Sequence, residues 1–215
     1  VLHAEHGGGN NSTFTCRALS STGTDTYSVI AAAVGSLKGP RHGGANMQVM
    51  RQFKELQRWV TNWESDGQVA DYLAKILRRE VGDGSGLIYG MGHAVYTISD
   101  PRTVLLKRYA WELAKKHEEM AAELSLMERI ERLTPEVFAS VTGKEKVMCA
   151  NVDMYSGLIY QMLRIPPELF TPVFAAARVA GWSAHRIEEQ LTGGRIMRPA
   201  YKAIARPQHY VPLEQ

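Results

Sequence analysis

The sequence is poor in cysteine, with Cys16 and Cys149 alone among 215 residues. Two thiols cannot build a disulfide framework, and without a Cys-x-x-Cys spacing they suit a reducing compartment. The longest stretch biased toward apolar residues, 27–37, is far shorter than the ~20 residues that a membrane span needs. No secretory signal is visible. We therefore expect a cytoplasmic protein with no membrane contact.

An excess of charge of one sign is also missing. The chain has 25 lysines and arginines against 22 aspartates and glutamates, a net charge of +3. The basic residues are scattered and form no block, so the charge does not favour a nucleic-acid partner. The content of 45% hydrophobic and 22% charged residues is ordinary for a globular protein of one or two domains.

Most of the chain shows the spacing of amphipathic helices. Apolar residues recur three and four apart, as in 46–60 and 68–79, and capping residues such as Ser65 and the pair Asp100-Pro101 mark helix starts. The stretch 27–38 is apolar nearly all round, so we expect it to be buried on most sides. The predicted helices are 13–21, 27–38, 46–60, 68–79, 102–116, 118–132, a new helix starting at 134–136, 158–163 and 170–190.

Residues 82–100 differ from this pattern. Five glycines fall within 82–92, and short β-prone runs in 87–96 could form a small hairpin. Glycine lets a ligand approach the backbone closely, which would explain the composition. A plain surface loop is the alternative.

Three histidines and an aspartate stand in turns or near helix ends. His42 lies in the turn Gly39–Asn46, which could also be a simple helix-ending loop. His3 and His6 stand three apart, but no further ligand at a usual spacing favours a metal site. Asp153 lies at or near a helix start, where an N-cap is the simpler reading.

Two arginines stand in unfavourable places. Arg102 is in the first turn of a helix, where a cation opposes the helix dipole, so a bound anion would give it a purpose. Arg178 lies in the apolar middle of 170–190. It needs a carboxylate, either from the protein or from a ligand, because an unpaired buried charge is very unfavourable.

Together these stretches resemble the citrate synthase family. The motifs occur in family order at 3–10 (His-Ala-Glu-His-Gly-Gly-Gly-Asn), 39–46 (Gly-Pro-Arg-His-Gly-Gly-Ala-Asn), 90–96 (Gly-Met-Gly-His-Ala-Val-Tyr), 100–102 (Asp-Pro-Arg), 151–157 (Asn-Val-Asp-Met-Tyr-Ser-Gly), 177–182 (Ala-Arg-Val-Ala-Gly-Trp) and 198–199 (Arg-Pro). The resemblance covers essentially the whole chain, but only about the C-terminal half of a usual member. Because the first residue is Val1, we expect a fragment, a processed product or part of a longer chain.

The resemblance implies an all-α fold with a large and a small helical domain, and a homodimer. Residues 1–44 and 166–215 would belong to the large domain, whose N-terminal half is missing, and 45–165 would form the small domain. Family members condense acetyl-CoA with oxaloacetate and hydrolyse the product to citrate and CoA. No permanently bound cofactor is implied, since CoA is a co-substrate.

The resemblance also implies roles for single residues. Asp153 would be the base, His42 the donor to the enol or enolate oxygen, and His93 the donor to the oxaloacetate carbonyl. The carboxylates of oxaloacetate would be bound by His6, Arg102 and Arg178, with Arg198 reaching the partner subunit's site. Asn10 and Ser12 are candidates for supporting His42. CoA would lie along Leu87, Ile88, Tyr89, Gly90, Met91 and Gly92.

The sequence departs from the family pattern at Thr97, where members often carry a basic residue suited to the CoA phosphates. Three alternatives stay open. The chain could belong to a 2-methylcitrate synthase, which uses propionyl-CoA and shares these residues. It could also be a non-catalytic paralogue or regulatory subunit that keeps the fold, or a fragment that is inactive by itself.

Overall fold

The computed structural model describes residues 7, 9–40, 42–93, 96–116, 118–200, 204, 209 and 212. Within these residues the fold is all-α, and the one β contact is an isolated bridge between Met91 and Ala150. The described helices are α1 (Asn11–Ser20), α2 (Thr26–Lys38), α3 (Ala45–Trp59), α4 (Asp66–Leu77), α5 (Pro101–Ala114), α6 (Glu118–Thr142), α7 (Val152–Met162), the 3-10 helix η1 (Pro167–Leu169) and α8 (Phe170–Thr192).

Short polar side chains start several of these helices. Asp25 accepts a hydrogen bond from the Ser28 N–H, and Ser65 does the same for Gln68. Asp100 caps α5, which has Pro101 at its first position. Each cap satisfies a backbone N–H that has no partner inside the helix. The predictions of helix starts at Ser65 and Asp100-Pro101 are confirmed.

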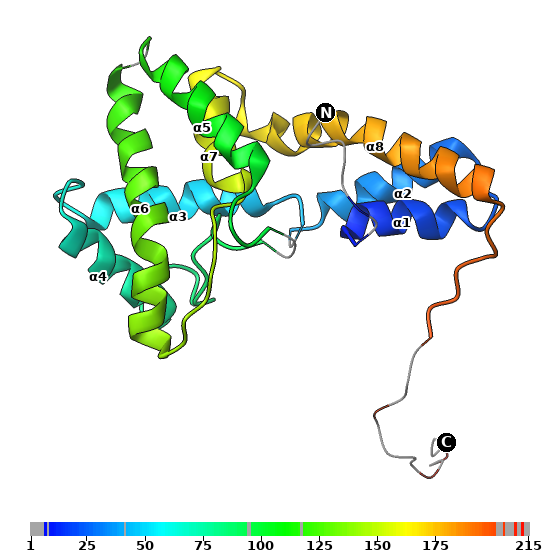
Figure 1. Cartoon of the computed structure of the whole chain (residues 1–215), viewed down its shortest axis with the longest axis horizontal. Coiled ribbons are helices and arrows are strands. Elements are labelled where there is room, and N and C mark those ends of the chain that lie inside the picture. Colours follow the sequence, from blue (N-terminus) through cyan, green and yellow to red (C-terminus); the bar gives the residue numbers. More distant parts are fainter. Residues whose placement is uncertain are drawn as a thin grey trace.

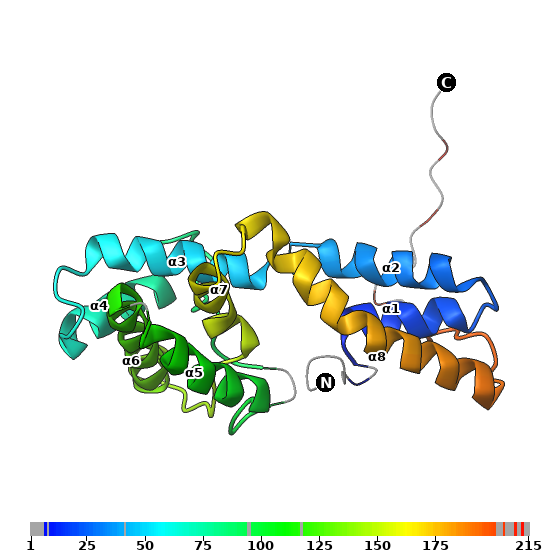
Figure 2. The same ribbon diagram turned by 90° about the horizontal axis from the view of Figure 1, so that it is seen from above.

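The helices form two groups along the long axis of the molecule (Figures 1 and 2). At one end α1, α2 and α8 pack on one another, and at the other α3, α4, α5, α6 and α7 surround a larger core. The smaller group has a buried cluster of Cys16, Val29, Ala33, Leu37 and Trp182. The turn between α2 and α3, which carries His42, joins the two groups.

The prediction that 27–38 is buried on most sides is wrong. Val29 and Leu37 of α2 are buried, but Tyr27 is 89% exposed and Val34 is 40% exposed. Among the described elements, α1 and α8 cover only part of this apolar helix. An apolar face therefore stays open on α2, next to Phe14 of α1, which is 45% exposed.

The prediction of a new helix at 134–136 is also wrong. Helix α6 continues through Pro135 to Thr142. Proline removes one backbone donor from a helix, which is normally unfavourable. Here Leu133 and Val137 are buried on either side of the proline, and the Thr134 hydroxyl donates to the Ile130 carbonyl at 2.6 Å. Packing on the core overrides the local preference.

The hairpin predicted in 87–96 does not form in the described part of that segment. Tyr89 and Gly90 form a turn, and no strand precedes it. The backbone bonds of this loop go instead to the segment before α7: Gly92 N–H donates to the Cys149 carbonyl at 2.7 Å. The loop is thus held by another part of the chain.

Candidate active site

The turn that carries His42 is fixed by close backbone contacts. The His42 N–H donates to the Gly39 carbonyl at 2.9 Å, and the Gly43 N–H donates to the Leu37 carbonyl at 2.8 Å. A Cβ at Gly43 would lie 2.2 Å from the Leu37 oxygen, so no larger residue fits. Thr171 of α8 donates to the Gly43 carbonyl at 3.0 Å. The turn therefore has one shape, set by the end of α2 and the start of α8.

The His42 imidazole points toward a polar cluster between α1 and α8. Its Nε2 lies 3.1 Å from the Ser12 Oγ, and the Ser12 hydroxyl lies 2.8 Å from Asn10 Oδ1. Nη1 of Arg178 donates to Asn10 at 3.3 Å and to Ser12 at 3.5 Å. Burial, and then the charge of Arg178, lowers the pKa of His42 below its ordinary value. His42 is therefore a neutral imidazole near neutral pH.

A second cluster surrounds His93. Arg102 binds the Asp100 carboxylate through Nε at 2.9 Å and Nη2 at 2.7 Å, and this ion pair is buried. Nη2 of Arg102 also lies 3.4 Å from Nε2 of His93. The Tyr96 N–H donates to Nδ1 of His93 at 3.1 Å, which leaves the proton of the neutral ring on Nε2; the contact of Nε2 with the guanidinium, which also only donates, is then not a hydrogen bond. Burial, and then the charge of Arg102, lowers the pKa of His93.

Asp153 lies in the first turn of α7. The Asn151 side chain caps the helix and accepts from the Asp153 N–H at 3.0 Å. Asp153 is partly accessible to solvent but surrounded by protein, and burial raises its pKa to about 6 against the opposing charges of Arg102 and Arg178. A carboxylate with such a pKa can take up and release a proton near neutral pH.

The glycine-rich loop lies directly against the start of α7. Gly90 has φ +83°, and a Cβ there would come within 2.9 Å of the Met154 Cα. The Asn151 N–H donates to the Gly90 carbonyl at 2.8 Å, and its side-chain amide donates to the Gly92 carbonyl at 2.9 Å. Asn151 therefore ties the loop to the helix that carries Asp153.

Five of the predicted site residues lie close together. The positive charges of Arg102 and Arg178 both act on the pKa of Asp153. The charge of Arg178 also acts on His42, and His93 contacts Arg102. These five residues come from the His42 turn, the loop before α5, and helices α5, α7 and α8. The structure thus brings them to one place between the two helix groups.

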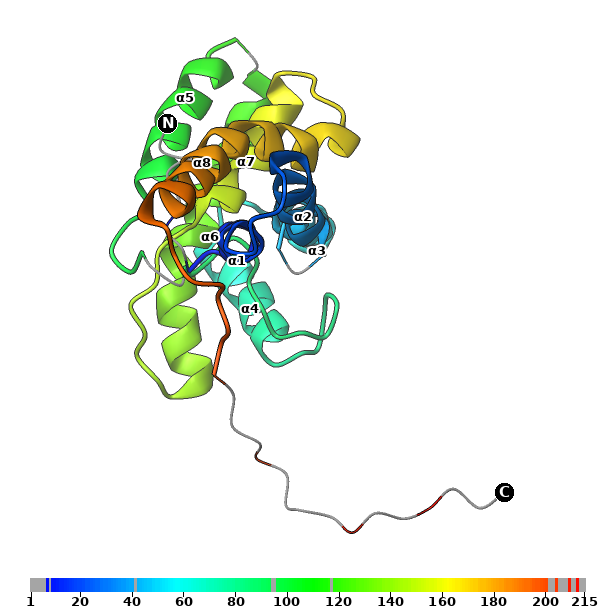
Figure 3. The ribbon, with the colours of Figure 1, turned by 90° about the vertical axis from the view of Figure 1, so that its right-hand side faces the viewer.

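Two predicted residues are not part of this cluster as described. Arg198 is exposed in the segment after α8, where the neighbouring Met197 N–H donates to Ser21 Oγ at the end of α1. That segment leaves the far end of α8, on the side facing the viewer in Figure 3. His6 lies outside the described residues, as does His3.

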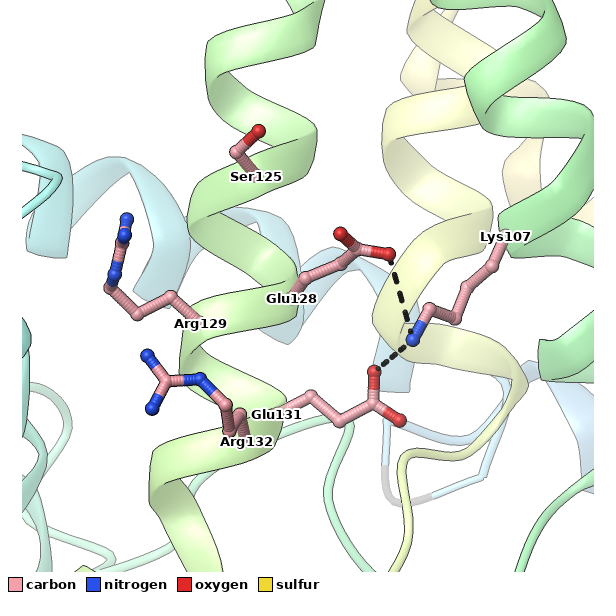
Figure 4. Close-up of a pocket in the computed structure, with 6 residues that line it drawn as sticks. All are labelled: Lys107, Ser125, Glu128, Arg129, Glu131 and Arg132. Carbon is pink, nitrogen blue, oxygen red and sulfur yellow. Dashed lines mark hydrogen bonds and ion pairs between the residues drawn. The ribbon is translucent and has the colours of Figure 1, made fainter.

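A cavity of about 580 Å³ opens on α5 and α6, away from these residues (Figure 4). Its charged side chains neutralise one another: Lys107 binds Glu131 at 2.9 Å, and Arg132 binds Asp66. We interpret it as a surface ion-pair network. The described residues contain no group of three or more side chains suited to a metal ion. None of the described helices is both long and apolar enough to cross a membrane.

A second cavity, of about 440 Å³, lies between α5, α7 and α8 and adjoins the site. Arg102 lines it together with apolar groups such as Leu105 and Phe174. The Ser156 hydroxyl, buried in its wall, has no hydrogen-bond partner among the described residues. The site is therefore polar around the histidines and mainly apolar where it meets this second cavity.

Sequence reasoning missed two supporting residues, Asp100 and Asn151. The sequence identifies Asp100 only as a helix cap, yet in the structure it also binds the Arg102 side chain. The signal was present, because a carboxylate two residues before an arginine at a helix start can reach both its N–H and its guanidinium. Asn151 gave no such signal, since its bonds to Gly90 and Gly92 span about 60 residues of sequence.

Comparisons with known proteins show the family to which the chain is similar. The family model "Citrate synthase, C-terminal domain" matches residues 1–200. A citrate synthase of Synechocystis sp. is 41% identical over 100% of this chain and 49% of its own length. A 2-methylcitrate synthase of Shewanella oneidensis is 34% identical over 99% of this chain and 51% of its own length.

A solved structure has the same fold. It is the ternary complex of citrate synthase from Thermoplasma acidophilum with carboxymethyl coenzyme A and oxaloacetate. It superimposes with a TM-score of 0.76 at 30% identity, over 98% of this chain and 52% of that one. The chain spans about half the length of the relatives it matches. The chain belongs to the citrate synthase family.

Proposed function

We propose that the protein carrying this chain condenses acetyl-CoA with oxaloacetate and hydrolyses the citryl thioester to citrate and CoA. The observation that carries the proposal is the position of Asp153, whose pKa is raised to about 6 between Arg102 and Arg178. The methyl group of a thioester is only weakly acidic, so its proton must be taken by a positioned base whose pKa lies near the working pH, beside a donor for the oxygen that gains charge.

In this proposal Asp153 removes a proton from the acetyl methyl group while His42 donates a hydrogen bond to the thioester oxygen. To donate, His42 must carry its proton on Nδ1. The Ser12 hydroxyl, 3.1 Å from Nε2, directs its one proton to Asn10 Oδ1 in this structure, and it would hold this tautomer by turning that proton to Nε2. The methyl carbon next forms a bond to the carbonyl carbon of oxaloacetate.

His93 and the two arginines would act on oxaloacetate. The Nε2–H of His93 would donate to its carbonyl oxygen and supply the proton as that oxygen becomes an alcohol. Arg102 and Arg178 would bind the two carboxylates, since a guanidinium matches a carboxylate with two parallel hydrogen bonds. His6, and Arg198 of a second subunit, would complete the set. Water would then cleave the thioester and release CoA.

CoA would lie along the loop from Leu87 to Gly92, which contacts the start of the Asp153 helix through Gly90. Thr97 supplies no cation for the CoA phosphates, so other groups would bind them. We also propose the division into large-domain residues 1–44 and 166–215 and small-domain residues 45–165. The two buried clusters on either side of the His42 turn support this division.

A homodimer is part of the proposal. The open apolar face of α1 and α2, with Phe14, Tyr27 and Val34 exposed, is the surface that supports it. A second copy of the chain would cover this face. A mass in solution twice that of one subunit would agree with a dimer, and a monomer would contradict it. A cytoplasmic or matrix location would suit substrates of this kind.

The activity is tested in the full-length protein by following thiol release from acetyl-CoA in the presence of oxaloacetate. We expect Asp153→Asn to lower kcat roughly 1000-fold, because it removes the base but keeps the shape of the side chain. Unchanged turnover in Asp153→Asn would rule out the assigned base. An inactive wild-type protein would favour a non-catalytic paralogue.

The second candidate is 2-methylcitrate synthase, because a relative with that name is 34% identical to this chain. Propionyl-CoA carries one more methylene than acetyl-CoA, a difference worth about 1–3 kcal/mol in an apolar pocket. The ratio of kcat/KM for the two thioesters distinguishes the candidates. A ratio above one for acetyl-CoA over propionyl-CoA favours citrate synthase.

A further inference from the structure

Gln52 of α3 makes two hydrogen bonds to the glycine-rich loop. Its Nε2 donates to the Leu87 carbonyl at 2.9 Å, and its Oε1 accepts from the Tyr89 N–H at 3.0 Å. One side-chain amide thus binds the backbone groups on both sides of Ile88. Two bonds from one planar group fix the orientation of this segment as well as its distance from α3.

The two hydrogen bonds from Gln52 also fix the direction in which the peptide groups of Ile88 point. In a planar trans peptide the C=O and the N–H point in opposite directions, and the described residues contain no cis peptide. Because the Leu87 carbonyl and the Tyr89 N–H point toward Gln52, the N–H and C=O of Ile88 point away from it. Gln52 therefore fixes the direction of both peptide groups of Ile88, whose side chain is buried and whose carbonyl accepts from the Met91 N–H at 3.3 Å.

The rest of the loop is anchored at its ends. The Tyr89 hydroxyl donates to Asp83 at 2.6 Å, and Asn151 holds Gly90 from the α7 side. Gly86, just before the segment, has φ +74°, and as a glycine it restricts the backbone less than any other residue would. Without Gln52 the backbone from Leu87 to Tyr89 would lose its two hydrogen bonds to α3.

We propose that Gln52 is a positioning residue for CoA. It does not touch CoA; it holds the stretch Leu87–Tyr89 in the orientation that the CoA moiety meets. The inference rests on the proposed function, in which CoA lies along this loop. A preorganised loop binds more tightly because it has less freedom to lose on binding.

The test uses Gln52→Met in the full-length protein, since methionine has a similar length and forms neither hydrogen bond. We expect the Kd of CoA, by calorimetry, and the KM of acetyl-CoA to rise about tenfold. We expect kcat and the KM of oxaloacetate to stay within about twofold. Hydrogen exchange at the Tyr89 amide should become faster, because its acceptor is lost.

Two further variants separate positioning from general damage. Gln48→Met changes the residue one turn earlier, which lines the same 350 Å³ groove, and should leave CoA binding unchanged. Gln52→Glu keeps the acceptor for the Tyr89 N–H but sets a carboxylate oxygen against the Leu87 carbonyl, so it should weaken CoA binding at least as much as Gln52→Met does.

The outcomes are distinct. If the wild type binds CoA and releases citrate, but Gln52→Met keeps the wild-type Kd and KM, the inference is wrong and the proposed function stands. If Gln48→Met weakens CoA as much as Gln52→Met does, the positioning role is also wrong. A wild-type protein that binds no CoA overturns the inference and the proposed function together.

Discussion

Arg102 and Arg178 flank the same aspartate but are held in opposite ways. Arg102 forms a buried ion pair with Asp100, so its charge is balanced inside the protein. Arg178 is only 1% exposed, and among the described residues it contacts the neutral groups of Asn10 and Ser12 and the ring of Phe174. Its Nε finds no hydrogen-bond partner there.

The difference shows in the pKa of Arg178. Burial, and then the nearby charge of Arg102, lowers this pKa to about 10, while Asp153 acts in the opposite direction. A buried guanidinium without a carboxylate partner destabilises the folded protein. We infer that the Arg102 side of the site is complete before substrate binds, whereas the Arg178 side is completed by the substrate carboxylate.

The same substitution, arginine to methionine, should lower the unfolding free energy far more at Arg102 than at Arg178. Arg102→Met leaves the fully buried Asp100 carboxylate without its ion-pair partner. Removing one partner of a buried pair usually costs about 3–5 kcal/mol of unfolding free energy. We expect a loss of this size at pH 7, measured by thermal and denaturant unfolding.

Lys107→Met on the same helix is the matched control for that loss. Lys107 is 30% exposed in its ion pairs with Glu128 and Glu131, and an exposed pair is worth at most about 1 kcal/mol. If Arg102→Met destabilised no more than Lys107→Met, the ion pair with Asp100 would not be the stabilising contact described above.

Arg178→Met should change stability much less. It removes a charge that has no carboxylate partner among the described residues, and methionine can still pack on Phe174. We expect the unfolding free energy to stay within about 1 kcal/mol of wild type, or to rise. The KM of oxaloacetate should nevertheless rise at least about 100-fold, because a bidentate carboxylate contact is lost. A large loss of stability in Arg178→Met would show that the protein already satisfies this charge.

Local signals were enough to predict much of the fold. Ser65 and the pair Asp100-Pro101 start helices where their capping chemistry predicted. The failures, at Pro135 and in 87–96, arose where contacts distant in sequence outweighed local preference. Buried neighbours keep α6 continuous through its proline, and the Cys149 carbonyl accepts the Gly92 N–H that a hairpin would have used within the loop.

The candidate site was predictable to a different degree. Arg178 was correctly singled out because an arginine in an apolar helix face requires a partner wherever the helix packs. Arg102 also attracted attention, but its partner Asp100 was missed because the aspartate was interpreted as a cap alone. The contact of Gln52 with Leu87 and Tyr89 depends on how α3 meets a loop 35 residues away, which no spacing rule predicts.

Asp153 interacts with the charges of both arginines, so its ionisation tests the proposed balance between burial and charge directly. Burial favours its protonated form and raises the pKa from the ordinary 3.8 to about 6. A raised carboxylate pKa means that folding is favoured by protonation. The stability of wild type relative to Asp153→Asn should therefore increase as pH falls from about 6 toward 4.

The most direct measurement is the pKa of the Asp153 carboxyl group in the ligand-free protein. Carboxyl carbons of labelled aspartate are followed by NMR as pH changes, and Asp153→Asn identifies the signal by its loss. We predict one aspartate signal, that of Asp153, with a pKa of about 6. An Asp153 signal that titrates at or below the ordinary 3.8 would contradict it, because the arginines would then outweigh burial and the carboxylate would be a weak base.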